Sequence, residues 1–580
     1  PSLDWRPRSW PALTPSGGAM AEQLDLAIRG GTLVDGTGAP ARRADVGIRG
    51  GKVAEIGALG GRAARELDAR GCVVAPGFVD IHTHYDAQVF WDRMLTISPW
   101  HGVTSVVMGN CGFGVAPTRP AHRDLIMRTL ENVEGMSLEA LRAGIGPDWP
   151  FETFPQYLDA LERRGTAINV GALVGHTPVR LYVMGEEATE REATEDELAQ
   201  MERIVAEAIR AGAIGFATSK SATHVGYAGR PVPSRAASLA EIERLAATLG
   251  VAGRGIVQAT IGRGFFTPEL AELARKTGRS VSWTALLAGA LGPDGHRKVL
   301  EDHQALQRQG VPVYPQVACR PLNFEFQWSA PFPYESMEIF KPVSAADRAG
   351  KKKIYADPQF RAAFRARGER GGIAGRWADT VVSWYPADPS LEEHSVAELA
   401  AKAGVHPVDF ALDLGLASDL EARFRIAVMN QDEGAVAELL AHPSVVLGLS
   451  DAGAHASQLC DGCFSTHLLG HWVREKRALS MEQAVRLLTS RSAEVFGIAG
   501  RGRLAVGLAG DVAVFDPDTV GCSPLRRVRD LPAGQDRLVA DATGVRAVVV
   551  NGVVLRQDGK DAVDPEGPLP GQVLRSGATA

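Results

Sequence analysis

Residues 73–86 read Val-Val-Ala-Pro-Gly-Phe-Val-Asp-Ile-His-Thr-His-Tyr-Asp. A short apolar run broken by a Pro-Gly pair indicates a buried strand next to a bend. Because alternate residues of a strand point to the same side, His82 and His84 present two imidazoles in one direction. Two ordinary surface histidines are the alternative reading. The apolar run before the pair and Asp86 after it favour a metal-binding pair.

This segment resembles the first barrel strand of the amidohydrolase superfamily. Residues 85–88 (Tyr-Asp-Ala-Gln) and 109–112 (Gly-Asn-Cys-Gly) narrow the resemblance to the N-acyl-D-amino-acid deacylases, also called D-aminoacylases. The resemblance runs from about Leu24 to Gln557 and is weak in its middle third. It implies a barrel that carries a metal-dependent hydrolase site, together with a β-sandwich built from the two chain ends.

Length and composition bound the kind of protein. A chain of 580 residues predicts a large domain plus an accessory domain. A net charge of −6 without any charged block gives little support to nucleic-acid binding. No apolar run approaches the ~20 residues that span a membrane, so no membrane partner is expected. Six irregularly spaced cysteines do not form a disulfide framework and fit a reducing cytoplasm.

The chain divides into regions of different pattern. Residues 1–19 are rich in Pro, Ser and Trp and lack a signal-peptide core, so we expect a disordered or cloning-derived extension. Short alternating strands separated by glycine breaks occur near both ends, which predicts one β-sandwich domain composed of residues 20–75 and 501–570.

Between residues 76 and 500, strands alternate with helical patterns, which predicts an α/β fold of parallel βα units. Eight strand candidates make a TIM-type (β/α)8 barrel. The segment from about 320 to 397 is aromatic, Pro-rich and charged without a clear period, and we expect a lid-like insertion over the barrel mouth. The eight candidates are the strand before His82 and residues 103–109, 167–174, 213–217, 255–259, 280–284, 311–315 and 445–450.

Active sites of such barrels lie at the carboxyl ends of the strands. Asp451 follows the eighth strand, where an anion near a metal-activated water can act as general base. The resemblance implies the same role and a metal contact for this aspartate; an N-cap aspartate is the alternative. Cys111 follows the second strand. It is either a small buried residue or, as the resemblance implies, a zinc-ligating thiolate.

Other candidates follow the third and fourth strands. His176 and Arg180 come after the third, where they could orient a substrate and pair with its carboxylate, or be ordinary loop residues. Lys220 follows the fourth strand and would match a carboxylated, metal-bridging lysine of the superfamily, although its alignment is uncertain by about one position. His224 and Arg235 are candidate contacts for an acidic substrate group.

The sequence departs from the family pattern at strands five and six. The family supplies a histidine after each of these strands, whereas residues 258–261 read Gln-Ala-Thr-Ile and residues 283–286 read Trp-Thr-Ala-Leu. His296 and His303 lie in a helix-like stretch and look misplaced for the role. This departure leaves open a single metal held by the remaining ligands, or a changed reaction. The pair Cys460 and Cys463 is too isolated to indicate structural zinc.

Three functions are compatible with these residues. The first, which we favour, is metal-dependent hydrolysis of a small-molecule C–N amide bond, with an N-acyl-D-amino acid as the expected substrate. The second is hydrolysis of a cyclic amide such as a hydantoin or a diketopiperazine. The third is a catalytically altered member that only binds a ligand. The resemblance implies one or two divalent ions, with Zn2+ as the expected metal, and the oligomeric state, including a homo-oligomer, stays open.

Overall fold

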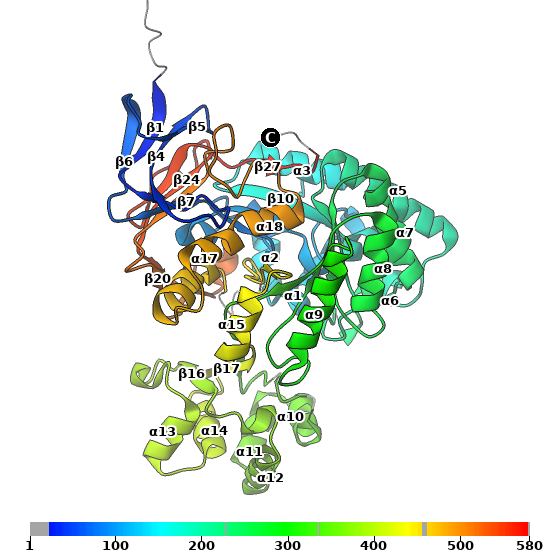
Figure 1. The fold of residues 1–580 in the computed structure, drawn as a ribbon. Coiled ribbons are helices and arrows are strands. Elements are labelled where there is room, and N and C mark those ends of the chain that lie inside the picture. Colours follow the sequence, from blue (N-terminus) through cyan, green and yellow to red (C-terminus); the bar gives the residue numbers. More distant parts are fainter. Residues whose placement is uncertain (1–22, 227–228, 332, 336, 455–460, 578–580) are drawn as a thin grey trace, which may run out of the picture.

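The computed structural model describes residues 23–226, 229–331, 333–335, 337–454 and 461–577 (Figure 1). The expected extension at residues 1–19 and Cys460 of the cysteine pair lie outside these residues. Within the described part of the chain, none of the helices is both long and apolar enough to cross a bilayer.

Eight parallel strands form the predicted barrel in consecutive order. The ring closes where Thr83 bridges Ala452 and the Asp451 N–H donates to the His82 carbonyl at 3.1 Å. The barrel is therefore sealed by the same residues that the sequence predicts to carry chemistry. The strands are β8 (Phe78–Asp80), β9 (Val103–Met108), β10 (Asn169–Gly175), β11 (Gly215–Ser219), β12 (Ile256–Thr260), β13 (Val281–Thr284), β14 (Val313–Val317) and β18 (Val446–Leu447).

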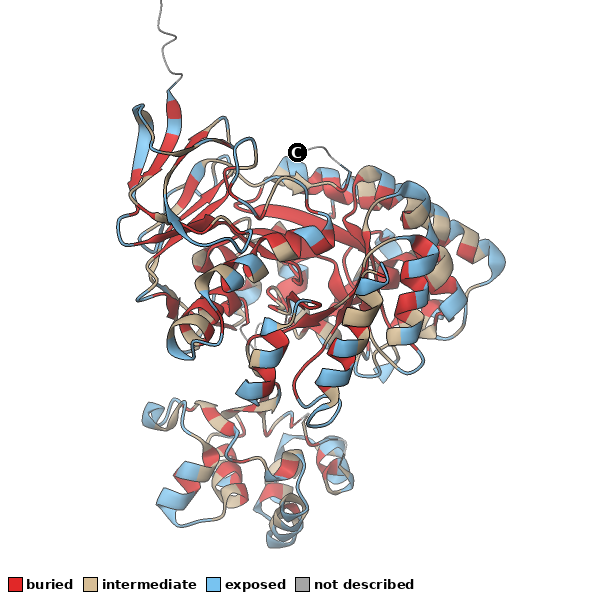
Figure 2. Cartoon of the chain, in the orientation of Figure 1, coloured by how far each residue is buried: buried red, intermediate tan, exposed pale blue. Residues whose placement is uncertain are grey.

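Helices surround the barrel strands, which are buried along their length (Figure 2). Strands covered on both faces are buried along their whole length, as β9 is. Thr194 begins α5 with a reciprocal capping box to Glu197, and Gly212 ends it. The helices around the barrel are α1 (Arg123–Glu134), α2 (Leu138–Ile145), α3 (Phe154–Arg164), α4 (His176–Met184), α5 (Glu195–Ala211), α6 (Pro233–Ala236), α7 (Leu239–Ala252), α8 (Thr267–Thr277), α9 (Gly295–Arg308), α15 (Glu433–Ala441), α16 (Phe464–His467), α17 (Met481–Leu488) and α18 (Ser490–Phe496).

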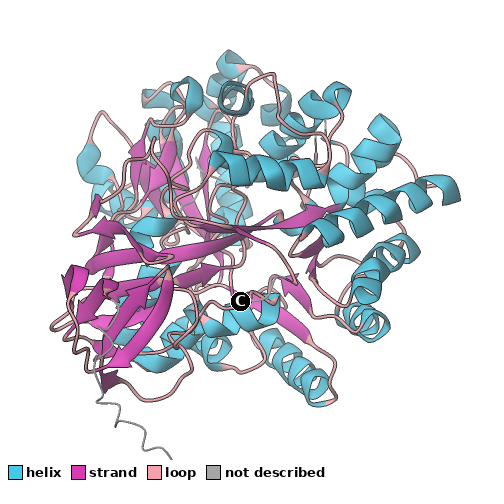
Figure 3. Ribbon diagram, turned by 90° about the horizontal axis from the view of Figure 1, so that it is seen from above, coloured by secondary structure: helices cyan, strands magenta, loops and turns pink. Residues whose placement is uncertain are grey.

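The two chain ends together form the small β-sandwich, whose strands gather on one side of the molecule (Figure 3). Its larger sheet joins β2 (Thr32–Leu33), β3 (Arg42–Arg43) and β7 (Val73–Pro76) to β19 (Val512–Phe515), β24 (Val545–Val550), β25 (Val553–Gln557) and β26 (Lys560–Asp561). Its smaller sheet contains β1 (Leu24–Arg29), β4 (Asp45–Arg49), β5 (Lys52–Gly57) and β6 (Ala63–Asp68). One apolar core, including Leu26, Val74 and Val512, lies between them.

The segment that opens the sequence analysis serves both domains. Val73–Pro76 pairs with the sandwich strand β19, whereas Phe78–Asp80 pairs with the barrel strand β9. Gly77 makes the passage between them, because a Cβ there would lie 2.1 Å from the Thr104 hydroxyl. The predicted bend at Pro76 and Gly77 is therefore the point where the chain passes from the β-sandwich to the barrel.

The insertion is a compact unit with a core of its own. It contains the antiparallel sheet β15-β17-β16, formed by Leu322–Gln327, Arg423–Met429 and Thr380–Trp384. Its helices are α10 (Lys341–Ala345), α11 (Arg348–Ala356), α12 (Pro358–Glu369), α13 (Val396–Ala403) and α14 (Pro407–Ala417). Buried aromatic residues such as Trp328 and Phe364 fill it. It begins where the sequence predicts but continues to Met429, because β17 is the central strand of its sheet.

Asn430 ties the returning strand of the insertion to the barrel. Its backbone N–H donates to the Ala288 carbonyl at 3.0 Å, and its side-chain oxygen accepts from the Ala288 N–H at 2.9 Å. Its side-chain N–H groups donate to the carbonyls of Ala318 and Arg320, each at 2.9 Å. The buried Asn430 side chain thus links the segments through which the chain enters and leaves the insertion, next to the end of β14.

A hairpin from the C-terminal part of the chain reaches the barrel mouth. It consists of β21 (Arg526–Val528), η11 (Pro532–Gly534) and β22 (Arg537–Val539). Arg527 pairs with Glu325 of the insertion, and Gln535 donates to Glu139 of α2 at 2.9 Å. Arg537 donates to the Thr96 carbonyl at 2.8 Å. The hairpin therefore contacts both the insertion and the first barrel loops.

Candidate metal centre

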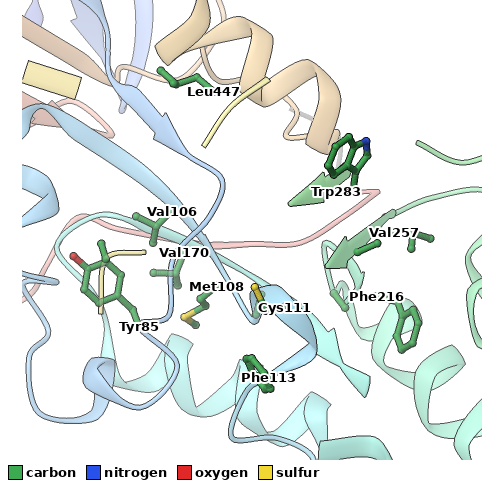
Figure 4. Close-up of a cluster of buried hydrophobic side chains, with 14 of the residues drawn as sticks. Tyr85, Val106, Met108, Cys111, Phe113, Val170, Phe216, Val257, Trp283 and Leu447 are labelled. Atoms are coloured by element: carbon green, nitrogen blue, oxygen red, sulfur yellow. The ribbon is translucent and has the colours of Figure 1, made fainter. Parts of the chain in front are cut away.

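Three predicted ligands converge at the carboxyl ends of the first two barrel strands. His82 and His84 follow β8, and Cys111 lies on the turn after β9. All three are buried, and one ligand atom from each lies within 4.8 Å of the others. Cys111 adopts a left-handed φ of 57° between Gly109 and Gly112. Figure 4 shows Cys111 close to Met108 and Phe113, at the edge of the buried apolar cluster.

Asp451 completes the arrangement from the end of β18. Its Oδ1 lies 3.3 Å from His82 Nε2 and 3.7 Å from His84 Nε2, and Cys111 Sγ lies 3.4 Å from His82 Nε2. Metal–ligand bonds of about 2.0–2.3 Å place the corners of a tetrahedron roughly 3.3–3.8 Å apart. The two imidazoles and the thiol therefore fit one divalent ion of the zinc type, and the Asp451 carboxylate lies beside both imidazoles.

Outer contacts orient both imidazoles. His82 Nδ1 lies 2.7 Å from Gln316 Oε1, and Gln316 Nε2 donates to Ser282 Oγ at 3.0 Å. His84 Nδ1 lies 3.0 Å from the carboxylate of Glu134, which is buried in the last turn of α1. Because Gln316 Oε1 is an acceptor, His82 Nδ1 carries a proton and its Nε2 is the atom that would ligate a metal, while Glu134 forms an ion pair with His84 at Nδ1.

The charges within the cluster favour a thiolate. Burial opposes ionisation of Cys111, but the neighbouring His82 and His84 outweigh it and lower the pKa of the thiol to about 7. Burial likewise disfavours a charged His84, yet Glu134 and Asp451 raise its pKa well above the ordinary value. A thiolate is the form of cysteine that ligates metals, whereas a protonated His84 must release a proton before its Nε2 can bind a cation.

Glu134 was not predicted from the sequence, and its removal tests its role. We expect Glu134→Gln to lower zinc affinity about 10–100-fold, because His84 loses the carboxylate that fixes its ring. Chelator competition measures this affinity, and Glu131→Gln on the same helix is the matched control. An unchanged affinity in the Glu134 variant would show that the contact does not support the ligand.

The structure places His176 and Arg180 inside a separate buried network. His176 Nε2 lies 2.9 Å from Glu241 Oε1, and Arg180 Nη1 donates to both oxygens of Glu241 at 2.5 Å. His176 and Arg180 are 0% exposed. The expected contact of Arg180 with a substrate carboxylate lacks support here, because Glu241 already occupies its guanidinium group. The predicted substrate-orienting role of His176 lacks support for the same reason.

This network gives a pH-dependent stability prediction. Burial opposes the charge of Glu241, but His176 and Arg180 hold its pKa at about 2. Since the folded pKa lies below the unfolded value, the stabilisation is present above about pH 4.5 and is lost as the pH falls towards 2. We expect Glu241→Gln to lower the free energy of unfolding by about 3 kcal/mol at pH 7.

Urea denaturation at pH 7 and at pH 3 measures this effect. The matched control is Glu243→Gln on the same helix, whose exposed pair with Lys276 is expected to contribute less than about 0.5 kcal/mol. A Glu241 variant that is as stable as the unaltered protein at pH 7 contradicts the assignment.

Lys220 is held by backbone carbonyl groups of the segment before α7. Its Nζ donates to the backbone carbonyls of Arg235, at 2.8 Å, and Ala237. A carboxylated lysine would present oxygens to these carbonyl oxygens, so the expected metal-bridging role does not fit this position.

His224 and Arg235 lie together on the segment between β11 and α7, with Arg235 on the short helix α6. His224 Nδ1 lies 2.7 Å from Ser219 Oγ, and its ring centroid is 5.0 Å from that of Phe113, two residues after Cys111. Arg235 Nη1 donates to the His224 carbonyl at 3.0 Å. Both residues are partly exposed. Of the four expected substrate contacts, these two stand beside the loop of a metal ligand.

The strand-five and strand-six positions carry no histidine ligand in the described structure. Gln258 Oε1 accepts from the Cys111 N–H at 2.7 Å. His303 accepts from Trp283 Nε1 at 2.8 Å, and His296 lies 3.2 Å from Glu438. Both histidines belong to α9, outside the barrel, so neither joins the metal cluster.

A small pocket opens beside Asp451. One wall is formed by the segment 450–454, and the other by Ile97 and the hairpin residues Arg537 and Leu538. The remaining lining residues are Tyr85, Gln88, Thr96, Asp461 and Gly462. The Asp451 side chain is 20% exposed, whereas those of His82 and His84 are 1% and 6% exposed. Asp451 is therefore the member of the cluster that a small molecule can reach.

Comparisons with known proteins agree with this chemistry. A profile of the amidohydrolase family matches residues 65–556. The N-acyl-D-glutamate deacylase of Alcaligenes xylosoxydans xylosoxydans is 33% identical over 575 residues, covering 97% of this chain and 98% of that protein. The D-aminoacylase of the same organism is 30% identical over 541 residues, covering 93% and 96%.

Solved structures give the same result. The N-acyl-D-glutamate deacylase from Bordetella bronchiseptica, complexed with zinc and a phosphonate mimic of the tetrahedral intermediate, has a TM-score of 0.64 at 28% identity, covering 96% of this chain and 100% of that one. A D-aminoacylase studied for its binuclear metal centre has a TM-score of 0.65 at 27% identity, covering 95% and 100%. A dihydropyrimidinase from Brevibacillus agri, 14% identical with a TM-score of 0.51, covers 96% of this chain and 99% of that one and shares the fold alone.

Proposed function

This chain belongs to the amidohydrolase family as a metal-dependent hydrolase of non-peptide carbon–nitrogen bonds, and we propose that its substrate is an N-acyl-D-amino acid. The N-acyl-D-glutamate deacylase and the D-aminoacylase, both matched over nearly their whole length, support this substrate class. The convergence of His82, His84 and Cys111, with Asp451 Oδ1 3.3 Å and 3.7 Å from the two imidazoles, is the single observation that carries the proposal.

The three buried residues of the site would hold the metal, and the partly exposed Asp451 would take part in the reaction. His82, His84 and Cys111 would hold a divalent ion, which polarises an amide carbonyl and lowers the pKa of water when bound. Asp451 lies between these ligands and the pocket, where its carboxylate can accept the proton of the attacking water. It then delivers that proton to the leaving amine nitrogen, which departs as the C–N bond breaks.

A single zinc ion is the stoichiometry that this chain's own residues support. The described donors form one cluster of tetrahedral size, and Gln258 stands at strand five. Two carboxamides and a serine line the inner face of strands five to seven, and carboxamides are weaker zinc ligands than imidazoles. We therefore propose one ion here, where the related D-aminoacylase was studied for a binuclear centre.

An acidic substrate group fits the loop that carries His224 and Arg235. Arg235 uses Nη1 for a backbone carbonyl, and its guanidinium fork is suited to a carboxylate. Hydrolysis of a cyclic amide is less supported, because Lys220 is held by two carbonyls and the cyclic-amide hydrolases are more distant in sequence. A purely ligand-binding role is disfavoured by the metal cluster.

The described cysteines are free thiols, and a cytoplasmic location stays a prediction.

The test is turnover by the zinc-loaded protein. A panel of N-acetyl amino acids in both configurations, with acidic and neutral side chains, is incubated with the enzyme, and the free amine is quantified. We expect release from the D series and preference for the acidic members. No turnover of any D substrate at full zinc occupancy, or equal turnover of the L series, would contradict the proposed substrate.

A further inference from the structure

Gln258 has one unused donor beside the metal centre. It lies in the middle of β12 and is fully buried, with 0% of its surface exposed. Its Oε1 accepts from the backbone N–H of Cys111 at 2.7 Å, whereas its Nε2 has no hydrogen-bond partner. Buried polar atoms without a partner are rare in native structures, so each asks for an explanation.

The orientation of this carboxamide is fixed by its neighbour. The Cys111 N–H can only donate, so the side-chain atom facing it must be the carbonyl oxygen. The Gln258 NH2 group therefore occupies the other position and cannot exchange places with the oxygen. Its free N–H groups belong to the same carboxamide that contacts the backbone of Cys111.

Gln316 on β14 is a comparison within the same barrel. Both of its side-chain atoms are used, since Oε1 lies 2.7 Å from His82 Nδ1 and Nε2 donates to Ser282 Oγ at 3.0 Å. Ser282 is also the strand partner of Gln258. Of these two buried glutamines near the metal ligands, one is fully paired and only orients a histidine, while the other keeps a donor.

We propose that the Nε2–H of Gln258 donates to the carbonyl oxygen of the bound amide, which makes Gln258 a catalytic residue. This inference rests on the proposed function. As water adds to the carbonyl carbon, the C=O π electrons move onto that oxygen, and a fixed donor in a buried site stabilises the charge that develops there. When the C–N bond breaks, the same electrons return to the carbonyl.

The test separates this donor from the anchoring role of Gln258. Gln258→Glu keeps the acceptor for the Cys111 N–H and, in its ionised form, removes the donor, whereas Gln258→Met removes both, so kcat is followed over a range of pH. For the zinc-loaded proteins, we expect Gln258→Glu to retain its zinc and thermal midpoint and to lose about 10²–10³-fold in kcat with little change in KM. A phosphonate mimic of the tetrahedral species should bind correspondingly more weakly, while affinity for the product carboxylate changes little.

The matched control is Gln316→Met, which removes the partner of His82 Nδ1 and should lower zinc affinity instead of kcat at full occupancy. A Gln258→Glu variant with kcat within threefold of the unaltered enzyme would overturn the inference. So would a variant that loses zinc and activity together, or one that binds the phosphonate as tightly as the unaltered enzyme. Absence of amide hydrolysis by the unaltered enzyme would instead overturn the proposed function, so the two failures are distinguishable.

Discussion

Replacing Asp451 with asparagine is expected to lower kcat about 10³-fold while leaving the zinc content unchanged. Asparagine is close in size to aspartate but cannot accept a proton. Asp451 is the partly exposed member of the cluster, and His82, His84 and Cys111 can hold the ion without it. Steady-state hydrolysis and metal analysis of the same preparations measure the two quantities.

An aspartate that only caps a helix provides the matched control. The Asp432 side chain accepts from the Ala435 N–H at the start of α15, the helix before β18. Asp432→Ala is expected to cost about 1 kcal/mol of stability and to leave kcat unchanged. If Asp451→Asn behaves like this control, with a stability loss and normal kcat, then Asp451 is not the general base.

Replacing both histidines of the pair with alanine is expected to abolish zinc binding and to lower activity about 10⁴-fold. Only Cys111 and Asp451 would remain at the site, too few for a stable zinc centre. A Lewis acid supplies several kcal/mol of transition-state stabilisation, and each increment of about 1.4 kcal/mol is a factor of ten in rate. Plasma mass spectrometry gives the zinc content per chain.

The control is a double alanine variant of His406 and His442, which are half-buried outside the metal cluster. It should keep both zinc and activity. A ratio near one zinc per chain in the unaltered protein is expected from the single cluster. A ratio near two would contradict the one-ion proposal, and full zinc retention in the His82/His84 variant would contradict the ligand assignment.

The cluster of His82, His84 and Cys111 could be anticipated because its members follow barrel strands, with the family resemblance pointing to Cys111. His82, His84, Cys111 and Asp451 each stand after an apolar run, and the carboxyl ends of parallel strands meet at one edge of the barrel. The eight strands were found for the same reason, since buried parallel strands are continuous apolar runs.

The outer residues could not be predicted in this way. Glu134 comes from the end of a helix, where an acidic residue before a glycine carries no sign of a metal site. Gln316 lies on a predicted strand, but its contact with His82 depends on how the barrel closes. Lys220 follows a strand as the ligands do, yet its side chain turns to backbone carbonyls, which the position alone does not reveal.

The composite sandwich has a consequence for how this enzyme is made. β7 lies between β2 and β19, so one of its neighbours comes from the last part of the chain to leave the ribosome. Until then, a fully apolar strand presents an unpaired edge on which nascent chains can aggregate. His82 follows β7 and β8 closely. The metal-binding pair therefore takes its final position only after the C-terminal strands have been synthesised and have paired with β7. A chain that leaves the ribosome before these strands are made would therefore be both aggregation-prone and inactive.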